Sequence, residues 1–409
     1  MISRRSVAVG VLGLVALGRN AWSQTPPPPE AAPAPEAAAA PPVEAPPPEV
    51  VAAPPPPSAT FKMEPTKGNT LKVGLLLQPQ FQALGDHTLD GYADNLFLRR
   101  ARILVGGSLF GVFDYFLDTD YPNLFLATNT AATATAPAMT SKNTPGMNIQ
   151  DAFITYHPMG DLVKIDAGYM LPPLAHNAVQ GAGTLYAWDY FAFSFLSSES
   201  FGSSGNPVGR DLGVQLRGLL LDGHLEYRAG LFQGLRQPET ATTVGSNNFF
   251  RATARVQINL LDPEPGFFYA GTYLGAKKIL SIGGSIDTQD SYHYYAGDVF
   301  ADLPAGGGVF TAQVNVAHWQ GGSFITTLPS ETAVMGEAGY NVGGIHVSPI
   351  LHYEYLHSTV ANQSRMGGGL AWWPYGHSSN LKAFYTRNDE AGTPHADNQF
   401  NIQWQIYFL

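Results

Sequence analysis

The residues of this chain that could do chemistry together are charged side chains spaced two or four apart within apolar segments. Arg100 and Arg102 are two apart, and Arg251 and Arg255 are four apart. In a β-strand the members of each pair lie on one face, because successive side chains alternate between the two faces. Such a row acts through its electric field: cationic side chains attract anions, and acidic ones opposite them would orient polar solutes. The spacing predicts a local positive wall opposite an acidic one.

Motifs for covalent or metal chemistry are weak in this sequence. The chain has no cysteine, so it offers no thiolate nucleophile, disulfide or cysteine-ligated metal. Gly202–Gly205 lacks the spacing of G-x-S-x-G, and no glycine loop has the spacing of a phosphate cradle. His346 and His352 are expected inside the fold and His357 on the opposite face; a metal site or triad there is the alternative to structural histidines. We predict no enzyme and no cofactor, and keep an outer-membrane hydrolase as an alternative.

The elements that position the charges are predicted from a period of two in the apolar residues, which is typical of β-strands. In Gln399–Leu409, Phe400, Ile402, Trp404, Ile406 and Phe408 alternate with Gln399, Asn401, Gln403 and Gln405. The same pattern predicts an all-β fold of about sixteen strands. They lie near 71–84, 95–109, 111–120, 148–157, 161–171, 210–222, 223–234, 248–261, 267–287, 294–303, 308–320, 332–343, 345–358, 363–374, 378–388 and 397–409.

Connection lengths distinguish a membrane barrel from a soluble sandwich, the alternative that alternation alone leaves open. Short connections are expected at 109–111, 157–161, 221–223, 262–266, 304–307, 343–344 and 375–377, and longer ones at 121–147, 172–209, 234–247 and 321–331. Tight turns at one end and longer loops at the other are typical of transmembrane antiparallel β-barrels, although 358–362 is a short exception at the loop end. An even strand count places both ends of the barrel region on the periplasmic side.

The N-terminus predicts export. Arg4 and Arg5 precede a short apolar core from Val7 to Leu17, and cleavage is expected near Ser23. A retained membrane anchor is the alternative. Residues 24–60 are mostly Pro, Ala, Glu and Val, which cannot form a core and favour an extended, disordered spacer on the periplasmic side. We therefore expect a signal peptide at 1–23, a Pro/Ala-rich linker at 24–60 and a barrel at 61–409.

Composition agrees with this organisation. Only 13% of residues are charged, 12% are aromatic and Gly numbers 44, yet no apolar run approaches the roughly 20 residues of a spanning helix. The formal charge of −10 becomes about −13 once Arg4, Arg5 and Arg19 leave with the signal, which disfavours nucleic acid as a partner. The expected partner is a lipid bilayer.

Four segments resemble the phosphate-selective porin O and P family. They are Phe97–Arg102, Phe113–Asp120, Gly209–Gly218 and Leu225–Gly234, and with the strand plan the resemblance extends over residues 61 to 409. It implies a sixteen-stranded barrel of the Gram-negative outer membrane, commonly trimeric, whose third outer loop folds inward as a constriction. Here that loop is Pro172–Gly209, with Tyr186, Trp188, Tyr190, Phe191, Phe193 and Phe195. A loop packed on the surface, or at a subunit contact, is the alternative.

Strand parity predicts the pore-lining charges, because a charge facing lipid near the midplane costs about 2–4 kcal/mol. The candidates are Arg100, Arg102, Asp114, Asp118, Lys164, Asp166, Arg217, Arg228, Arg251, Arg255, Arg365 and Lys382. Phosphate-selective members of the family use a ladder of lysines and arginines, whereas this chain mixes both signs. Each charge could instead form an Arg–carboxylate pair that braces the wall. We expect a passive channel for small hydrophilic solutes or anions, with a closed barrel that anchors the Pro-rich segment as the alternative.

Overall fold

A computed structural model describes residues 60–85, 91–130, 139–191, 209–236, 250–392 and 396–409. The predicted signal peptide and all of the predicted linker except Thr60 lie outside these residues, as do Phe193 and Phe195. No helix among the described residues is long and apolar enough to cross a membrane.

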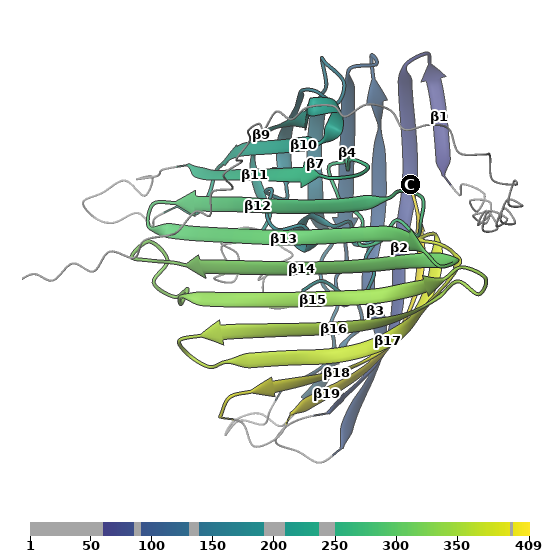
Figure 1. Ribbon diagram of the computed structural model, residues 1–409. Helices are drawn as coiled ribbons and strands as arrows, with labels where there is room; N and C mark the ends of the chain where they lie inside the picture. Colours follow the sequence, from purple (N-terminus) through teal and green to yellow (C-terminus); the bar gives the residue numbers. More distant parts are fainter. Residues whose placement is uncertain (1–59, 86–90, 131–138, 192–208, 237–249, 393–395) are drawn as a thin grey trace, which may run out of the picture. The chain divides into compact units, whose positions relative to one another are not determined.

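Sixteen antiparallel strands close into a barrel (Figure 1), which confirms the predicted fold. They are β2 (Asn69–Gly85), β3 (Tyr92–Leu109), β4 (Phe113–Asp120), β7 (Asn148–Tyr156), β8 (Lys164–Met170), β9 (Asp211–Leu220), β10 (Leu225–Phe232), β11 (Arg251–Asn259), β12 (Ile279–Gln289), β13 (Tyr292–Ala305), β14 (Gly308–Gln320), β15 (Glu331–Val342), β16 (Val347–Ser358), β17 (Gln363–Tyr375), β18 (Ser379–Glu390) and β19 (Asp397–Phe408). Each pairs with its neighbour in the chain, and β19 closes the ring on β2, with Phe408 opposite Leu75.

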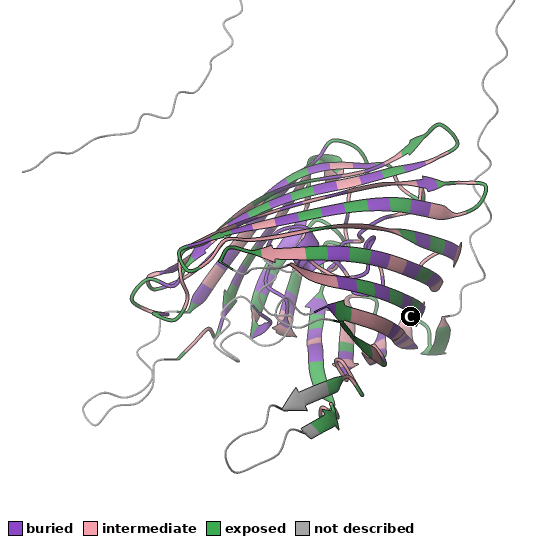
Figure 2. Ribbon diagram, turned by 90° about the horizontal axis from the view of Figure 1, so that it is seen from below, coloured by how far each residue is buried: buried purple, intermediate pink, exposed green. Residues whose placement is uncertain are grey.

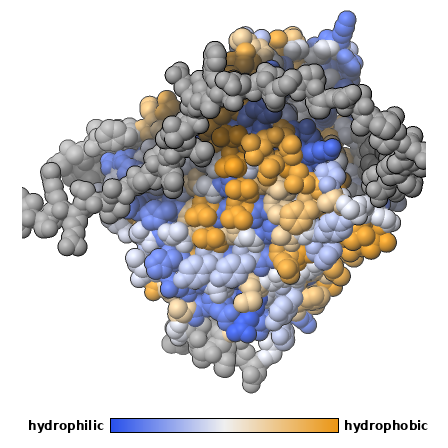
Figure 3. All heavy atoms as spheres, in the orientation of Figure 1, coloured by the Kyte–Doolittle hydropathy of each residue, from blue (hydrophilic) through white to orange (hydrophobic). Residues whose placement is uncertain are grey.

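The strands bury polar residues inside the barrel and expose apolar ones outside. On β19, Gln403 and Gln405 are 1% exposed, whereas Trp404 is 53% exposed. Figure 2 shows the same alternation of buried and exposed residues along most strands, and Figure 3 shows apolar side chains gathered in the middle of one face. A soluble barrel would reverse this order, because water favours polar groups on the surface. The outer wall is therefore suited to a hydrocarbon environment.

Three short strands lie outside the ring. β1 (Phe61–Thr66) pairs with the start of β2 beyond the C-terminus, where the Thr60 hydroxyl donates to the Leu409 carbonyl at 3.0 Å. β5 (Ala127–Thr130) and β6 (Met139–Lys142) form a hairpin within the connection expected at 121–147. These strands are only four to six residues long, too short for a period-two signal.

Most tight turns lie at one end of the barrel, here called the turn end, and most long connections at the other, the loop end. Two short 3-10 turns occur among the described residues, η1 (Asn177–Val179) at the loop-end connection and η2 (Leu221–Gly223) at the turn end.

One predicted turn is wrong. Residues 262–266 were expected as a tight turn followed by a strand from 267, but β12 begins only at Ile279. Pro263 and Pro265 cannot donate to a strand ladder, so the chain leaves the wall there.

Two connections fold into the barrel and form its core with the inner wall. We call residues 171–191, which enter from the loop end, the third-loop insert, and residues 260–278, which enter from the turn end, the turn insert. Leu174, Val179 and Phe191 of the first pack with Phe267 and Tyr269 of the second, together with inward aromatic side chains of β10, β13 and β14. The inward position of the described part of the third loop agrees with the resemblance and excludes, for those residues, a loop packed only on the surface.

Candidate functional site

The two inserts meet inside the barrel through a short parallel backbone contact. Gln180 and Tyr269 form an isolated parallel bridge. The Gly181 amide donates to the Tyr269 carbonyl at 2.9 Å, and the Tyr269 amide donates to the Val179 carbonyl at 3.1 Å. These two hydrogen bonds join a short extended segment of the third-loop insert to one of the turn insert.

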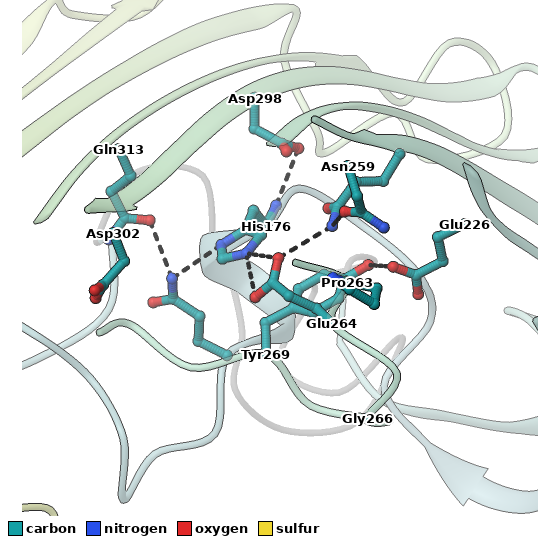
Figure 4. Close-up of polar contacts among 12 residues, drawn as sticks. His176, Glu226, Asn259, Pro263, Glu264, Gly266, Tyr269, Asp298, Asp302 and Gln313 are labelled. Atoms are coloured by element: carbon teal, nitrogen blue, oxygen red, sulfur yellow. Dashed lines mark hydrogen bonds and ion pairs between the residues drawn. The ribbon is translucent and has the colours of Figure 1, made fainter. Parts of the chain in front are cut away.

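A buried histidine–carboxylate pair joins the inserts beside this contact (Figure 4). The Nε2 atom of His176 lies 3.1 Å and 3.2 Å from the two carboxylate oxygens of Glu264. The Gln180 amide donates to Nδ1 of His176 at 3.0 Å, which leaves Nε2 as the ring nitrogen that faces Glu264 as a donor. The imidazole is stacked between the rings of Tyr269 and Phe300, at 4.5 Å and 4.3 Å. Packing on both faces fixes the ring.

The Glu264 carboxylate of the turn insert has several hydrogen-bond partners. It accepts hydrogen bonds from the Tyr273 hydroxyl at 2.7 Å and from the Gln257 amide of β11 at 3.0 Å. Burial by itself raises the pKa of this carboxyl, but His176 and these hydrogen bonds outweigh it and leave the pKa below its ordinary value. Glu264 therefore stays ionised although it is 1% exposed.

The wall at β11 and β13 holds both inserts through a second buried pair. Arg255 binds both oxygens of Asp298, at 2.6 Å and 2.7 Å. The same guanidinium donates to the Leu174 carbonyl of the third-loop insert and to the Tyr269 hydroxyl of the turn insert, each at 3.1 Å. Asp298 also accepts the backbone amide of His176 at 3.0 Å (Figure 4).

The far end of the third-loop insert is fixed on the opposite wall. Asp189 bridges Arg99 and Arg100 at 2.9 Å and 2.7 Å, and these two arginines hold the pKa of its carboxyl below its ordinary range despite burial, which works in the opposite direction. Lys382 of β18 donates to the carbonyls of Leu185 and Ala187, at 2.7 Å and 2.9 Å. The insert thus reaches from the β11–β13 wall to the β3 and β18 walls.

Most predicted pore-lining charges lie on the inner face, and the arginines are paired with carboxylates beside them. The pairs not already described are Arg102 with Asp118 and Asp120, Arg217 with Asp166, Arg228 with Glu226, and Arg251 with Asp287. The four arginines of the expected positive wall, Arg100, Arg102, Arg251 and Arg255, each lie beside a carboxylate, so they do not form a row of unpaired cations. This is the bracing arrangement that the sequence left open.

Three candidates differ from the rest. The Asp114 side chain is 51% exposed and lies 3.4 Å from His157 at the turn end, where Lys164 pairs with Asp161. Arg365 lies over the Trp188 ring, with its guanidinium carbon 5.2 Å from the centroid, and donates to Gln399 at 3.2 Å. Arg365 therefore contacts the third-loop insert, and Lys164 contacts the turn insert, because its ammonium donates to the Pro265 carbonyl at 3.2 Å.

The three clustered histidines separate in the structure. His352 is buried between Glu337 and Glu354, and His357 is exposed, both as expected. His346 lies in a turn with a positive φ of 54°, so its predicted inward position on a strand is wrong. No group of three metal-ligating side chains occurs among the residues that the structure describes.

No protein-family model matches this chain, and no curated protein sequence does either. Solved structures do match. An anion-selective porin from Comamonas acidovorans is 10% identical with a TM-score of 0.52, over 83% of this chain and all of that one. OmpTdeltaL8, a loop-deletion mutant of an outer membrane protein of Vibrio cholerae, is 13% identical with a TM-score of 0.50, over 84% and 100%. The outer membrane channel DcaP of Acinetobacter baumannii is 12% identical with a TM-score of 0.50, over 85% and 99%.

The chain has the fold of outer-membrane channel barrels. At this identity the likeness concerns the fold alone, and it leaves the specific phosphate-selective family unsupported.

The residues that join the inserts were mostly missed by sequence reasoning. Strand parity predicts the direction of a side chain only within a strand. The residues missed lie outside the ring strands, one of them in a segment that was expected to be a strand: His176, Asp189, Glu264 and Tyr269. One signal was present: Glu264 stands between Pro263 and Pro265, which excludes it from a regular ladder.

An uncharged polar wall lies on the inner face of β2 and β19. Gln78 donates to Gln405 at 2.8 Å, and Gln403 donates to Gln80 at 2.9 Å. Within the described part of the chain, Nδ2 of Asn401 and Oε1 of Gln403 are buried and have no hydrogen-bond partner. The wall therefore carries polar amide groups without a net charge.

Proposed function

We propose that this protein is a passive channel of the Gram-negative outer membrane for small hydrophilic solutes. The observation that carries the proposal is the inverted barrel: an apolar outer wall, a polar inner wall and two inserts inside the bore. Such a wall suits lipid outside and water inside. The channel needs no catalytic residue or cofactor, since movement down a gradient requires only a path.

The charges favour a general channel over a phosphate-selective one. Anion selectivity needs unpaired cationic side chains along the path. In this chain the buried arginines bind carboxylates, and Lys382 is occupied by two carbonyls. The inner wall of β2 and β19 carries uncharged amides in place of cations, which also supports a channel without anion preference.

Export through a cleaved signal peptide at 1–23, a periplasmic linker at 24–60 and assembly as a homotrimer belong to the same proposal. Mass spectrometry of the mature protein tests the cleavage near Ser23, and native mass spectrometry in detergent tests the trimer. A mature chain that keeps Arg4 and Arg5 would contradict the cleavage, and a monomer at all concentrations would contradict the trimer.

Planar-bilayer recording tests the channel itself. Purified folded protein should give discrete conductance steps, and the reversal potential in a salt gradient should lie close to zero. A large reversal potential with the sign of anion preference would instead support selectivity for anions such as phosphate.

A closed structural barrel that anchors the Pro-rich segment is the second candidate, favoured by the tight packing of the inserts. It predicts no conductance steps under any condition, together with loss of cell-envelope attachment when residues 24–60 are deleted.

A further inference from the structure

The two inserts lie inside the bore of the barrel and contact each other there. The third-loop insert contacts the β13–β14 wall through Asp298, Asn315 and Gln313, which bind His176, Asn177 and Gln180. Its other side contacts β2 and β19, where Gln78 and Gln405 donate to the carbonyls of Ala182 and Gly183. The described part of this insert therefore crosses the bore from one wall to the opposite one.

The turn insert fills the space toward the remaining strands. Arg217 of β9 donates to the Pro265 carbonyl at 3.1 Å, and Arg228 of β10 donates to the Phe267 carbonyl at 2.8 Å. The Phe267 ring packs 4.4 Å from Phe153 of β7, and Thr272 donates to Asp302 of β13 at 2.7 Å. Each insert thus has its own anchors on the wall.

The junction between the inserts contains fewer charged contacts than their attachments to the wall. Several charge-assisted hydrogen bonds attach the inserts to the wall. The inserts are joined to each other by three backbone hydrogen bonds, the His176–Glu264 pair and the apolar packing described above. His176, Val179, Glu264 and Tyr269 are at most 1% exposed, so no solute passes between the inserts as they stand.

We infer that the turn insert is a latch that closes the bore against the third-loop insert, and that solute passes when the junction between them opens. The inference rests on the proposed channel function and adds a gate to it. Separation at the junction leaves both sets of wall anchors in place, so opening requires no strand of the barrel to move.

A reversible disulfide across the junction tests the latch. A Cβ atom built on Gly181 lies 3.7 Å from the Phe268 Cβ, within the range of disulfide geometry, and the backbone at Gly181 is not in the left-handed region. The chain has no native cysteine, so the variant Gly181→Cys/Phe268→Cys can form only this bond within one chain. Single-cysteine variants are the matched controls.

In planar bilayers, we expect the oxidised double variant to lose at least about ten-fold in open probability, a change of about 1.4 kcal/mol in the gating equilibrium, and to regain it on reduction. The single variants should not respond to reductant. A fully cross-linked protein that conducts as well as its reduced form would overturn the latch.

Glu264→Gln provides a second test that does not depend on the cross-link. The amide can still accept from His176 but lacks the charge, so the open probability should rise several-fold at unchanged single-channel conductance. An unchanged open probability would count against the latch. If neither wild type nor any reduced variant conducts, the channel function fails, and the latch with it.

Discussion

Buried arginines in this barrel are held in place by carboxylates within about one strand spacing. The side chains of Arg255 and Asp298 are both fully buried. Each of them also forms a hydrogen bond with a backbone group of the third-loop insert. A buried ion pair contributes little net stability when intact, but removal of one partner leaves an uncompensated charge. Stability at the residue scale therefore depends on the completeness of each pair.

Asp298→Asn should lower the free energy of unfolding by about 3–5 kcal/mol, because Arg255 loses its counter-ion inside the barrel. Equilibrium unfolding in guanidinium with lipid vesicles measures the change. Asp389→Asn is the control: Asp389 pairs with Arg387 at the exposed loop end of β18, where solvent screens the pair, and no measurable change is expected. Equal losses in the two variants would contradict the argument.

His377 makes the turn end sensitive to acid. Burial lowers its pKa to about 4, Lys382 adds a smaller decrease, and the hydrogen bond to the Thr272 carbonyl works in the opposite direction. Because the folded-state pKa lies below the unfolded value of about 6.5, the unfolded chain takes up the proton first. Stability associated with this group is present above pH 6.5 and is lost as the pH falls toward 4.

The expected result is a smaller loss of stability between pH 7 and pH 4 in His377→Gln than in wild type, measured by unfolding at each pH. If both proteins show the same pH dependence, His377 is not the group responsible.

At the scale of elements, each strand has two faces with opposite requirements. In β14, Val314 at the centre of the strand is 49% exposed on the outer face, whereas the neighbouring Asn315 is fully buried inside. A one-residue shift in register would reverse every such position, so alternation and register specify each other.

Val314→Arg should destabilise the barrel by about 2–4 kcal/mol, because it places a charge at the centre of a lipid-facing strand. Val342→Arg, at the turn end of β15, should cost about 0–1 kcal/mol, since a charge there can reach the interface. Unfolding from lipid vesicles compares the two. Similar costs would mean that the outer face is not in hydrocarbon.

The inserts differ from the strands because no hydrogen-bond ladder with neighbouring strands fixes the course of their backbone. Residues 267–278 were expected to form the first part of a strand at 267–287, and Tyr269 and Tyr273 do fit a period of two. Pro263 and Pro265 end the ladder before these residues, and Tyr269 is buried in one apolar core with residues of the third-loop insert.

At the scale of the whole molecule, we expect the ion selectivity of the proposed channel to follow from the balance of charge across the bore. Arg102 neutralises two carboxylates, Asp118 and Asp120, whereas Arg100 shares Asp189 with Arg99. Loss of Arg102 therefore leaves more uncompensated negative charge than loss of Arg100 does.

Both Arg100→Ala and Arg102→Ala should shift the reversal potential toward cation preference, with the larger shift for Arg102→Ala. Arg387→Ala, at the exposed loop end, is the control and should have little effect at physiological salt. A reversal potential unchanged in both inner-wall variants would show that this part of the wall does not face the conducting path.

The sequence alone determined the strands of this protein. All sixteen ring strands were predicted, most within a few residues at either end, because a wall between lipid and a polar interior imposes a period of two on every strand. It also indicated which charges point inward, as at Arg102 and Arg255, since parity follows directly from strand position.

Only the tertiary structure decided what those charges do. Ion pairing depends on which strands are neighbours, so the counter-ions of Arg251 and Arg255 on β12 and β13 could not be chosen from spacing alone. The interior course of residues 171–191 and 260–278 depends on packing between segments about ninety residues apart, which leaves no periodic signal in either. The candidate site lies where those segments meet, at His176 and Glu264, and the fold brings it together from opposite ends of the barrel.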